Sequence, residues 1–308
     1  MSRHTGYIGR FAPSPSGSLH FGSLLAALAS YLDARANNGS WLVRMEDIDT
    51  PRCVKGADSD ILHTLERYGF EWDGEVMYQS HQHERYRHAV EALLARESAY
   101  YCTCTRKMIK DAGGAYPGTC RYASRPPENA AVRAKLVTPR NHVSDRIQGD
   151  IVIDDPHALE DPVIKRRDGL FAYNLVVVMD DAYQNVTHIV RGNDLLTTTA
   201  TQQSLYALLE YPAPTYAHIP VASVTPGRKL SKQNHAAPLS QDRIVPTLLS
   251  AMSLLGLPVS QAPQDGNIER LLSWAIAEWN VNFVPKRSEI IVDRYQSTYY
   301  SDPQVTAE

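Results

Sequence analysis

The chain has 308 residues, of which 43% are hydrophobic and 21% charged, and its formal net charge is −3. This length predicts two or three domains with apolar cores, and the charge excludes a protein that coats nucleic acid through general basicity. No stretch of about 18 apolar residues and no secretory signal is visible, so we expect a cytoplasmic protein without a membrane span.

Strands and helices alternate in the N-terminal third of the chain. Residues 7–11 (YIGRF) predict a short strand, and the apolar residues within 24–36 recur at helical spacing. Residues 40–49 predict a second strand that is apolar and then acidic, and helices are expected at 58–68 and 82–96. Such alternation favours an α/β fold with a parallel, doubly wound sheet.

The rest of the chain predicts an insertion followed by a return to the sheet. Residues 121–168 mix prolines, polar turns and short strand candidates, which is typical of a small α/β or β-rich lobe. The elements expected after residue 121 are strands at 130–137, at 149–155 and within the buried-strand segment 171–196, helices at 246–255 and 268–280, and a loose tail from Tyr295.

A loop rich in proline, serine and glycine separates the first strand from the first helix. It reads RFAPSPSGSLHFGSL over residues 10–24. In open α/β sheets such a turn lies at the edge where ligands bind, and the helix N-terminus attracts anions. Glycine allows close approach of phosphate, and Ser14, Ser16, Ser18 and His20 offer hydrogen bonds. An ordinary capped loop is the alternative, because no P-loop or GxGxxG motif is present.

A second polar loop, GRKLSKQNH, follows the last predicted strand. Lys229 and Lys232 lie three residues apart and flank Ser231. Near the same sheet edge, two cations could hold a triphosphate and offset charge that develops on its α-phosphate. A solvated charged loop is the alternative for this segment alone.

Together these segments resemble class I aminoacyl-tRNA synthetases. APSPSGSLHFGS is similar to the HIGH region of that family, and KLSKQ to its KMSKS loop; RFAPSPSG, RMEDID, AYNLVVVMDD and VRGNDLL narrow the resemblance to the glutamyl branch. Ser23 replaces the second histidine of HIGH, and two of the five KMSKS residues differ, but both lysines and the serine are kept. Over about residues 6–240, the resemblance implies a Rossmann-like parallel sheet with an inserted zinc-bearing α/β lobe and a short C-terminal helical region.

The resemblance implies ATP-dependent activation of glutamate to glutamyl-adenylate, with Mg²⁺ accompanying the ATP. His20, Lys229 and Lys232 would be catalytic, because they stabilise charge on the reacting phosphate. The ATP-binding positions of the family fall on Pro13, Ser14, Gly17, His20, Gly22, Ser23, Lys229, Ser231 and Lys232. Its glutamate-binding positions fall on Arg10, Ala12, Ser14, Glu46, Tyr173 and Arg191.

The types of these side chains suit glutamate, which carries two carboxylates and one ammonium group. Arginine forks bind carboxylates, Glu46 can bind the ammonium group, and Tyr173 can donate a hydroxyl hydrogen bond. Which arginine takes which carboxylate stays open. The structural alternatives are a surface carboxylate for Glu46, a core position for Tyr173 and an ion pair with Asp194 for Arg191.

Three of the four cysteines crowd into one short segment. Cys102 and Cys104 are one residue apart, and 15 residues separate Cys104 from Cys120. In a reducing compartment this clustering suggests one structural zinc ion rather than a disulfide. Structural zinc takes four ligands, and the resemblance places the fourth at Tyr116. Water in place of Tyr116, or three unpaired thiols without metal, are the alternatives; Cys53 stands apart as an ordinary residue.

Only 76 residues follow Lys232, whereas full glutamyl-tRNA synthetases carry helical anticodon-binding domains beyond this loop. The chain therefore resembles the truncated glutamyl-queuosine tRNA(Asp) synthetases. These activate glutamate without tRNA and transfer it to queuosine at the wobble position of tRNA(Asp). The expected divisions are two catalytic halves at 1–99 and 171–240, an acceptor-binding-like lobe at 100–170, and a stem-contact-like helical region at 241–308.

Three other functions remain open from the sequence. The chain could be a compact glutamyl-tRNA synthetase that charges a tRNA 3′ end, a ligase that passes glutamate to a small amine, or a binding module with a decayed site. The expected partners are ATP, L-glutamate and queuosine-bearing tRNA(Asp), with a monomer as the expected state. The residues that contact the RNA are not identified by any motif.

Overall fold

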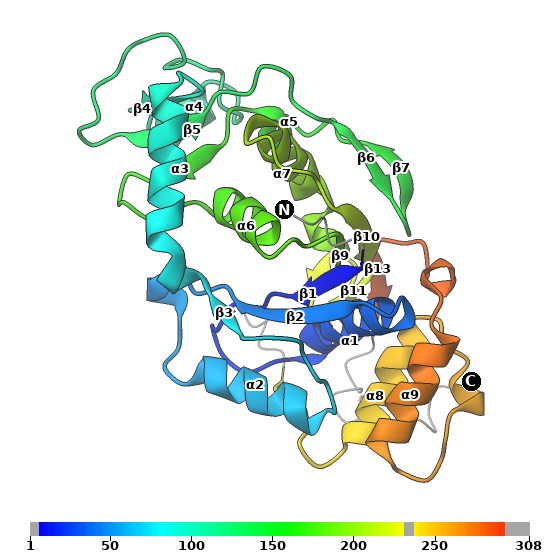
Figure 1. Ribbon diagram of the computed structural model, residues 1–308. Helices are drawn as coiled ribbons and strands as arrows, with labels where there is room; N and C mark the ends of the chain where they lie inside the picture. The colour runs from blue at the N-terminus through cyan, green and yellow to red at the C-terminus, as the bar shows by residue number, and fades with distance from the viewer. Residues whose placement is uncertain (1–5, 231–236, 293–308) are drawn as a thin grey trace.

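The computed structural model describes residues 6–230 and 237–292, and its centre is a β-layer that is parallel except for its edge strand β7 (Figure 1). Two sheets form this layer, in the strand orders β1-β2-β3 and β7-β6-β10-β9. The N–H of Thr187 donates to the carbonyl oxygen of Ile8 at 2.9 Å, so β9 lies beside β1 and joins the sheets. The strands are β1 (Ile8–Phe11), β2 (Ser40–Met45), β3 (Met77–Tyr78), β6 (His142–Asp145), β7 (Gly149–Val152), β9 (His188–Gly192) and β10 (Thr215–Ile219). The parallel sheet expected from the sequence is confirmed.

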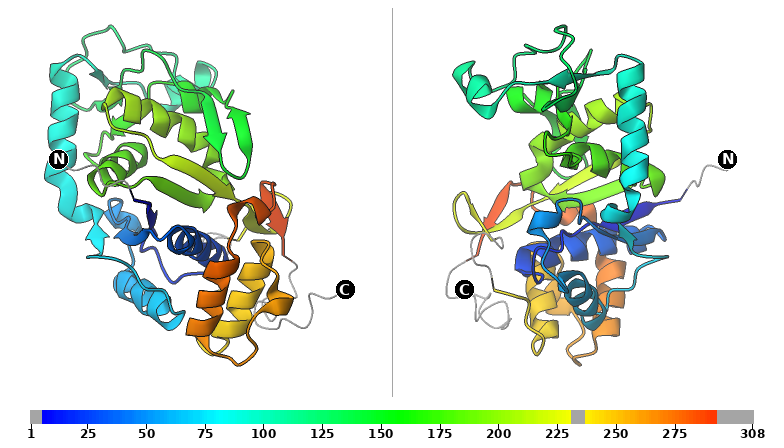
Figure 2. Two further views of the ribbon diagram at one scale, coloured as in Figure 1. Left: turned by 45° about the vertical axis from the view of Figure 1, so that its right-hand side comes forward. Right: turned by 90° about the vertical axis from the view of Figure 1, so that its left-hand side faces the viewer.

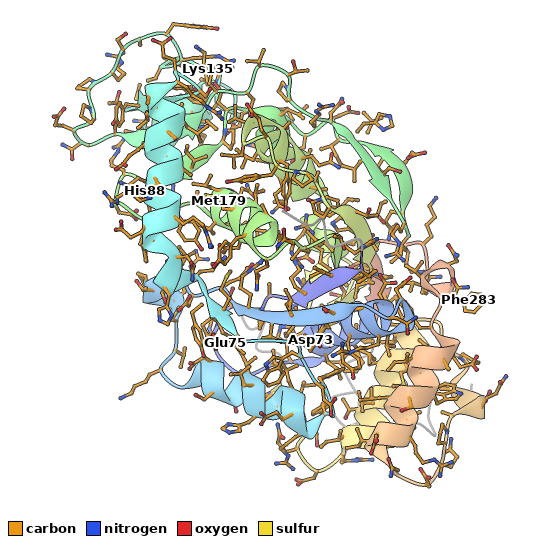
Figure 3. All side chains as sticks on the ribbon, viewed as in Figure 1. Asp73, Glu75, His88, Lys135, Met179 and Phe283 are labelled. Carbon is orange, nitrogen blue, oxygen red and sulfur yellow. The ribbon has the colours of Figure 1, made fainter. Side chains whose placement is uncertain are left out.

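Helices cover both sides of this layer (Figure 1). Helices α1 and α2 lie on one side and α6 and α7 on the other, while α3 runs from the sheet to the inserted lobe. Side chains fill the space between α3 and α6, where Met179 belongs to a buried apolar cluster (Figure 3). The helices are α1 (Phe21–Ala36), α2 (Ala57–Arg67), α3 (His83–Ala95), α6 (Tyr173–Tyr183) and α7 (Leu196–Leu208). Within the described ranges, no helix is both long and apolar enough to cross a membrane.

The segment from residue 99 to 165 forms a separate small sheet and a hairpin (Figure 2). The small sheet is antiparallel, in the order β4-β5-β8. The hairpin of β6 and β7 joins the central layer instead, because β6 pairs with β10 at Asp145 and Tyr216. The elements of the small lobe are β4 (Ala99–Cys102), α4 (Arg106–Asp111), β5 (Ala131–Ala134) and β8 (Val163–Lys165), while the short helix α5 (Pro156–Leu159) packs on α7.

The C-terminal helices pack on α1 and share its core. Leu248 and Met252 of α8 and Leu271 and Leu272 of α9 are buried in the same apolar cluster as α1. The strands and helices of the C-terminal region are β11 (Val221–Thr225), β12 (Arg228–Lys229), α8 (Ile244–Leu254), α9 (Ile268–Glu278) and β13 (Glu289–Ile291). Short 3₁₀ helices occur at η1 (Thr50–Arg52), η2 (Gln79–Gln82), η3 (Asn193–Leu195), η5 (Val259–Gln261) and η6 (Val281–Phe283). The predicted loose tail from Tyr295 lies outside the described residues.

One predicted element is wrong. The segment 171–196 was expected to be buried strand, but α6 occupies Tyr173–Tyr183 and only β9 is a strand. A short continuous apolar run does not distinguish a buried strand from a helix buried on several sides. As a helix, the run places Asp180 and Asp181 side by side at its buried end, where arginines meet them.

Candidate active site

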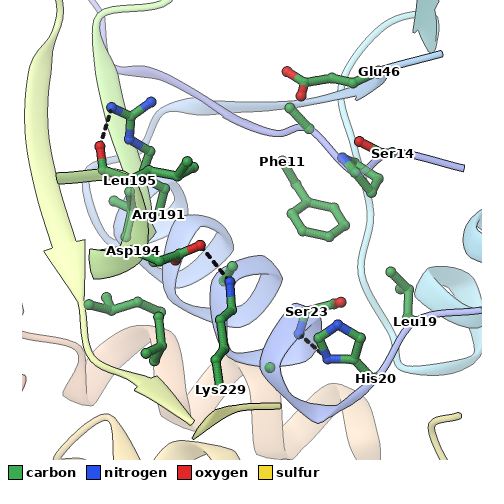
Figure 4. A pocket seen from close by; sticks show the side chains of 18 of the residues that line it. Phe11, Ser14, Leu19, His20, Ser23, Glu46, Arg191, Asp194, Leu195 and Lys229 are labelled. Carbon is green, nitrogen blue, oxygen red and sulfur yellow. Dashed lines mark hydrogen bonds and ion pairs between the residues drawn. The ribbon is translucent and has the colours of Figure 1, made fainter. Parts of the chain in front are cut away.

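A cavity of about 450 Å³ opens at the carboxyl ends of β1, β2 and β9 (Figure 4). Most of the candidate residues line it: Arg10, Ala12, Pro13, Ser14, His20, Gly22, Ser23, Glu46, Tyr173, Arg191 and Lys229. Gly17 lies in the same loop, with a φ of 131° that favours glycine, but it is not part of the wall. Ser231 and Lys232 fall outside the described residues.

The N-terminus of α1 faces this cavity. His20 caps the helix, because its Nδ1 accepts a hydrogen bond from the Ser23 N–H at 3.3 Å. Because Nδ1 accepts, the proton of the imidazole lies on Nε2, which is a hydrogen-bond donor. A Cβ on Gly22 would lie 3.1 Å from the His20 ring and 3.3 Å from the Leu230 carbonyl oxygen. Glycine there lets the Leu230 backbone pack against the positive end of the helix.

The flanks of the lysine loop lie against the same turn. The N–H of Leu239 donates to the carbonyl oxygen of Leu19 at 2.9 Å, and Pro238 pairs with His20 in an isolated β-bridge. On the other flank, the ammonium of Lys229 binds Asp194 at 2.6 Å. Segments more than 200 positions apart in sequence therefore meet at one wall of the cavity.

Buried charges lie at and behind the opposite wall, where Arg10 and Glu46 line the cavity. Arg10 Nε binds Asp181 Oδ1 at 3.1 Å, and Arg44 Nη1 binds the same oxygen at 2.8 Å. Arg44 Nη2 lies 3.4 Å from Glu46. Burial raises the pKa of Glu46 even though Arg44 and Arg10 oppose that shift. An ammonium group in the cavity would favour the ionised carboxylate and offset the cost of burying it.

Arg191 is a buried cation that points into the cavity from β9 (Figure 4). It donates from Nε to His218 at 3.0 Å and from Nη1 to Gln202 at 2.8 Å, and its Nη2 donates to Thr199 at 2.8 Å. None of its hydrogen-bond partners among residues 6–230 and 237–292 carries a negative charge. Asp194 binds Lys229 instead, so the ion pair considered as an alternative for Arg191 is not formed. A buried guanidinium in this setting favours an anionic ligand.

A buried relay orients Arg191. His218 lies beside it on β10, and its Nδ1 is 2.6 Å from Asp145 Oδ2. Because a carboxylate only accepts and a guanidinium only donates, Nδ1 of His218 carries the proton and Nε2 accepts from Arg191. Burial lowers the pKa of His218, the hydrogen bond to Asp145 opposes this, and the charge of Arg191 adds to the lowering. The imidazole is therefore neutral at neutral pH.

Sequence reasoning gave no site role to four residues at or behind the cavity wall: Arg44, Asp181, Asp194 and His218. Asp181 and His218 contact the predicted Arg10 and Arg191 from distant segments, Asp194 binds Lys229, and Arg44 lies two residues before Glu46. One signal was present: Arg44 interrupts an apolar strand, and Asp180 and Asp181 end an apolar run. Charged residues within buried segments are expected to pair with one another.

Cys102, Cys104 and Cys120 converge in the small lobe. Their Sγ atoms lie within 4.8 Å of one another, and 3.6 Å separates those of Cys104 and Cys120. A disulfide requires about 2.05 Å, whereas thiolates about 2.3 Å from a tetrahedral zinc ion lie about 3.8 Å apart. The Tyr116 hydroxyl accepts from the Cys120 N–H at 2.8 Å and also lies beside the Cys102 side chain. The residues fit a metal ion with Tyr116 next to it.

Comparison with known proteins decides the family. The family model for the catalytic domain of class I tRNA synthetases, E and Q, matches residues 8–256. A glutamyl-Q tRNA(Asp) synthetase of Photobacterium profundum is 51% identical over 294 residues, covering 96% of this chain and 95% of the relative. The chain belongs to the glutamyl-Q tRNA(Asp) synthetase family. The class I resemblance and the ligase class inferred from the sequence are thereby confirmed.

Other relatives agree with this family. A glutamyl-Q tRNA(Asp) synthetase of Serratia proteamaculans is 51% identical over 297 residues, covering 96% of this chain and 98% of the relative. Among solved structures, a glutamate-tRNA synthetase from Elizabethkingia anophelis superposes with a TM-score of 0.77 at 24% identity. That match covers 96% of this chain and 70% of the other, and it shows that the two share the class I synthetase fold.

Proposed function

We propose that the chain activates glutamate with ATP in the absence of tRNA and transfers it to queuosine at the wobble position of tRNA(Asp). The observation that carries this proposal is the cavity itself. One wall offers a helix N-terminus, His20 and Lys229 to phosphates, and the other offers buried arginines and Glu46 to an amino acid with two carboxylates. The names of the relatives in Photobacterium and Serratia support the same substrates.

In the proposed first step, the α-carboxylate of glutamate attacks the α-phosphate of ATP, and pyrophosphate leaves. No protein nucleophile is needed, so the side chains act by positioning and by charge stabilisation. His20 and Lys229 stabilise the phosphate charge together with Lys232, which lies outside the described residues. Pro13, Ser14, Gly17, Gly22, Ser23 and Ser231 complete the proposed ATP site, and Mg²⁺ would arrive with the nucleotide.

Glutamate would lie against the buried wall. Arg10 and Arg191 would bind its carboxylates, Glu46 its ammonium group, and the Tyr173 hydroxyl would donate a further hydrogen bond. Ala12 and Ser14 would border it from the loop after β1. We further propose that the protein is a cytoplasmic monomer. Its proposed domain divisions are residues 1–99, 100–170, 171–240 and 241–308.

The decisive experiment is glutamate transfer to tRNA(Asp) isolated from cells with and without queuosine. We expect labelled glutamate only on the queuosine-containing tRNA, and ATP–pyrophosphate exchange with glutamate when no RNA is added. Equal charging of both tRNA samples would exclude the proposal. Charging of tRNA(Glu) at its 3′ end would favour a compact glutamyl-tRNA synthetase, and transfer to a small amine alone would favour a small-molecule ligase.

Replacing His218 with leucine should weaken glutamate binding without changing ATP binding. The substitution removes the acceptor for Arg191 Nε and leaves Asp145 buried without its imidazole partner. Loss of a hydrogen bond to a charged group costs about 1.5–3 kcal/mol, so KM for glutamate should rise about tenfold or more. The measurement is pyrophosphate exchange with each substrate varied; equal rises in both KM values would contradict a positioning role.

The same relay predicts a pH dependence. Because the pKa of His218 is lowered, the ring stays neutral at neutral pH and gains a proton only below about pH 6.5, the ordinary value. That proton would sit on Nε2 and face Arg191, so glutamate affinity is present at neutral pH and lost as the pH falls. KM for glutamate should rise on acidification in the native protein, and His218→Leu should flatten that rise.

We propose that Cys102, Cys104, Cys120 and Tyr116 hold one structural zinc ion. Burial disfavours the thiolate of Cys120, but hydrogen bonds from the Thr103 backbone and from the neighbouring cysteines outweigh it and lower its pKa to about 7. A thiolate is the form that binds metal. The ion would hold the loops of the small lobe together and take no part in the reaction.

Elemental analysis of the purified protein should find about one zinc per chain. Cys120→Ser should lose the metal and lower the thermal stability of the lobe, whereas Cys53→Ser should keep both, because Cys53 lies apart from the cluster. Tyr116→Phe tests the fourth ligand and should release zinc to a chelator more readily than the native protein. Retention of zinc by Cys120→Ser would overturn the assignment.

A further inference from the structure

A second cavity of about 760 Å³ adjoins the first one. The two share Ser14, Ser16, Glu46 and Tyr173 in their walls. The second is enclosed by residues 46–53 after β2 and by residues 166–173, which lead from the small lobe into α6. It therefore lies between the catalytic sheet and the lobe and opens onto the proposed glutamate site.

We infer that this second cavity is the acceptor subsite, which receives a nucleotide bearing a vicinal diol and holds one hydroxyl against the activated glutamate. The inference rests on the proposed function, because it names where the second substrate of that reaction binds. Three features support this inference: a buried hydrogen-bond acceptor in the wall, exposed ion pairs at the rim that a ligand can replace, and wall residues shared with the first cavity.

The buried acceptor belongs to Gln79, whose side chain is fully buried and lines the second cavity. Its Nε2 donates to Asp180 at 2.9 Å, which fixes the orientation of the amide because a carboxylate only accepts. Its Oε1 is buried and has no hydrogen-bond partner within the described part of the chain. Such an atom is costly unless a ligand supplies a donor, and a hydroxyl group is a donor of the right kind.

The rim carries three charged side chains from both sides of the cavity. Asp49 Oδ2 lies 3.2 Å from Arg52 Nε and 3.8 Å from Arg166 Nη1. The side chains of Arg52 and Arg166 are 77% and 44% exposed. Ion pairs as exposed as these contribute little to the stability of the fold, so a ligand can replace them at a small cost in free energy. The guanidinium groups suit backbone phosphates, and the Asp49 carboxylate can accept a hydrogen bond from the second hydroxyl.

The shared wall allows the transfer step. The oxygen of one diol hydroxyl attacks the carbonyl carbon of glutamyl-adenylate and forms an ester bond. The bond between that carbon and the phosphate oxygen breaks, AMP leaves with the electron pair, and the hydroxyl proton passes to the departing phosphate. Glu46 and Tyr173, which border both cavities, would keep the two reactants in contact.

Two variants test the subsite through its hydrogen bonds. Gln79→Met keeps the volume and removes both the acceptor and the hydrogen bond to Asp180, and Asp49→Asn removes the rim carboxylate without touching Asp180. We expect each to lower kcat/KM for transfer to queuosine-containing tRNA(Asp) about tenfold, with pyrophosphate exchange within about twofold of native. Arg270→Ala is the control. Arg270 is an exposed arginine that pairs with Asp265 and lines neither cavity, so its replacement should change neither transfer nor exchange. Equal losses of exchange and transfer, or no loss of transfer, would overturn the inference.

A third variant fills the cavity instead of removing a hydrogen bond. Cys53 lines the second cavity but not the first. Cys53→Phe should block transfer and leave exchange intact, whereas Cys53→Ser should leave both intact. If the native protein charges no queuosine-containing tRNA, the proposed function fails. If the native protein charges it and these variants do so equally well, only the acceptor subsite fails.

Discussion

Replacing Arg191 with methionine should lower kcat/KM for glutamate in ATP–pyrophosphate exchange about a hundredfold. Arg191 is only 4% exposed, and its guanidinium is held by His218, Gln202 and Thr199, with no carboxylate among its hydrogen-bond partners in the described ranges. Its charge is therefore available to a carboxylate of the substrate. Truncating one partner of a buried, hydrogen-bonded charge pair costs about 2–5 kcal/mol, which is a hundredfold near 3 kcal/mol.

Two further variants make this result specific. Arg191→Lys keeps the charge but loses the planar fork, so it should recover only part of the activity. Arg270→Met removes an exposed arginine of the same size and should leave exchange at the native level. Thermal melting of each variant separates loss of binding from loss of folding. An Arg191→Met protein that melts normally and activates glutamate at the native rate would disprove the assignment.

Replacing Asp33 with alanine should destabilise the whole fold by about 3 kcal/mol or more. Asp33 lies on α1, is 1% exposed, and accepts hydrogen bonds from Tyr7, from both Nη atoms of Arg146 (2.5 and 3.0 Å) and from Trp279 Nε1 (3.0 Å). It thus ties the first strand, the β6–β7 hairpin and the C-terminal region to one helix. Removing one partner of a buried ion pair costs about 3–5 kcal/mol because the other groups stay buried without partners.

Chemical denaturation and thermal melting measure this effect. The melting temperature should fall by roughly 5 °C, because about 2.1 cal/mol/K per residue over 308 residues gives about 1.5 °C per kcal/mol. Asp265→Ala removes a carboxylate of the exposed pair with Arg270 and should cost about 1 kcal/mol or less. Similar losses in both variants would contradict a special role for Asp33.

The stabilisation by Asp33 should also depend on pH in a definite direction. Burial alone would raise the pKa of Asp33, but the hydrogen bonds from Arg146 and Tyr7 outweigh it and the pKa is lowered. A lowered pKa means that the stabilisation is present above the ordinary carboxyl value, about 3.9, and is lost as the pH falls below it. The difference in unfolding free energy between the native protein and Asp33→Ala should therefore shrink in acid.

Features that depend on neighbouring residues could be predicted from the sequence. The strand, the Pro-Ser-Gly loop and the helix from Phe21 follow one another along the chain, so their periodicity and composition identify them directly. The close cysteine spacing likewise predicted a cluster that the structure brings together. The candidate residues of the first cavity came from the resemblance to class I synthetases, whose motifs lie on short stretches of the chain.

Features that depend on distant partners needed the tertiary structure. The contact between Arg44 and Asp181 spans 137 positions, and the relay from Asp145 to His218 spans 73. A buried charge is stable only when its partner is brought beside it, and no local pattern names that partner. The order of most elements and the list of candidate site residues were thus predicted from sequence, while the fold decided which charges meet.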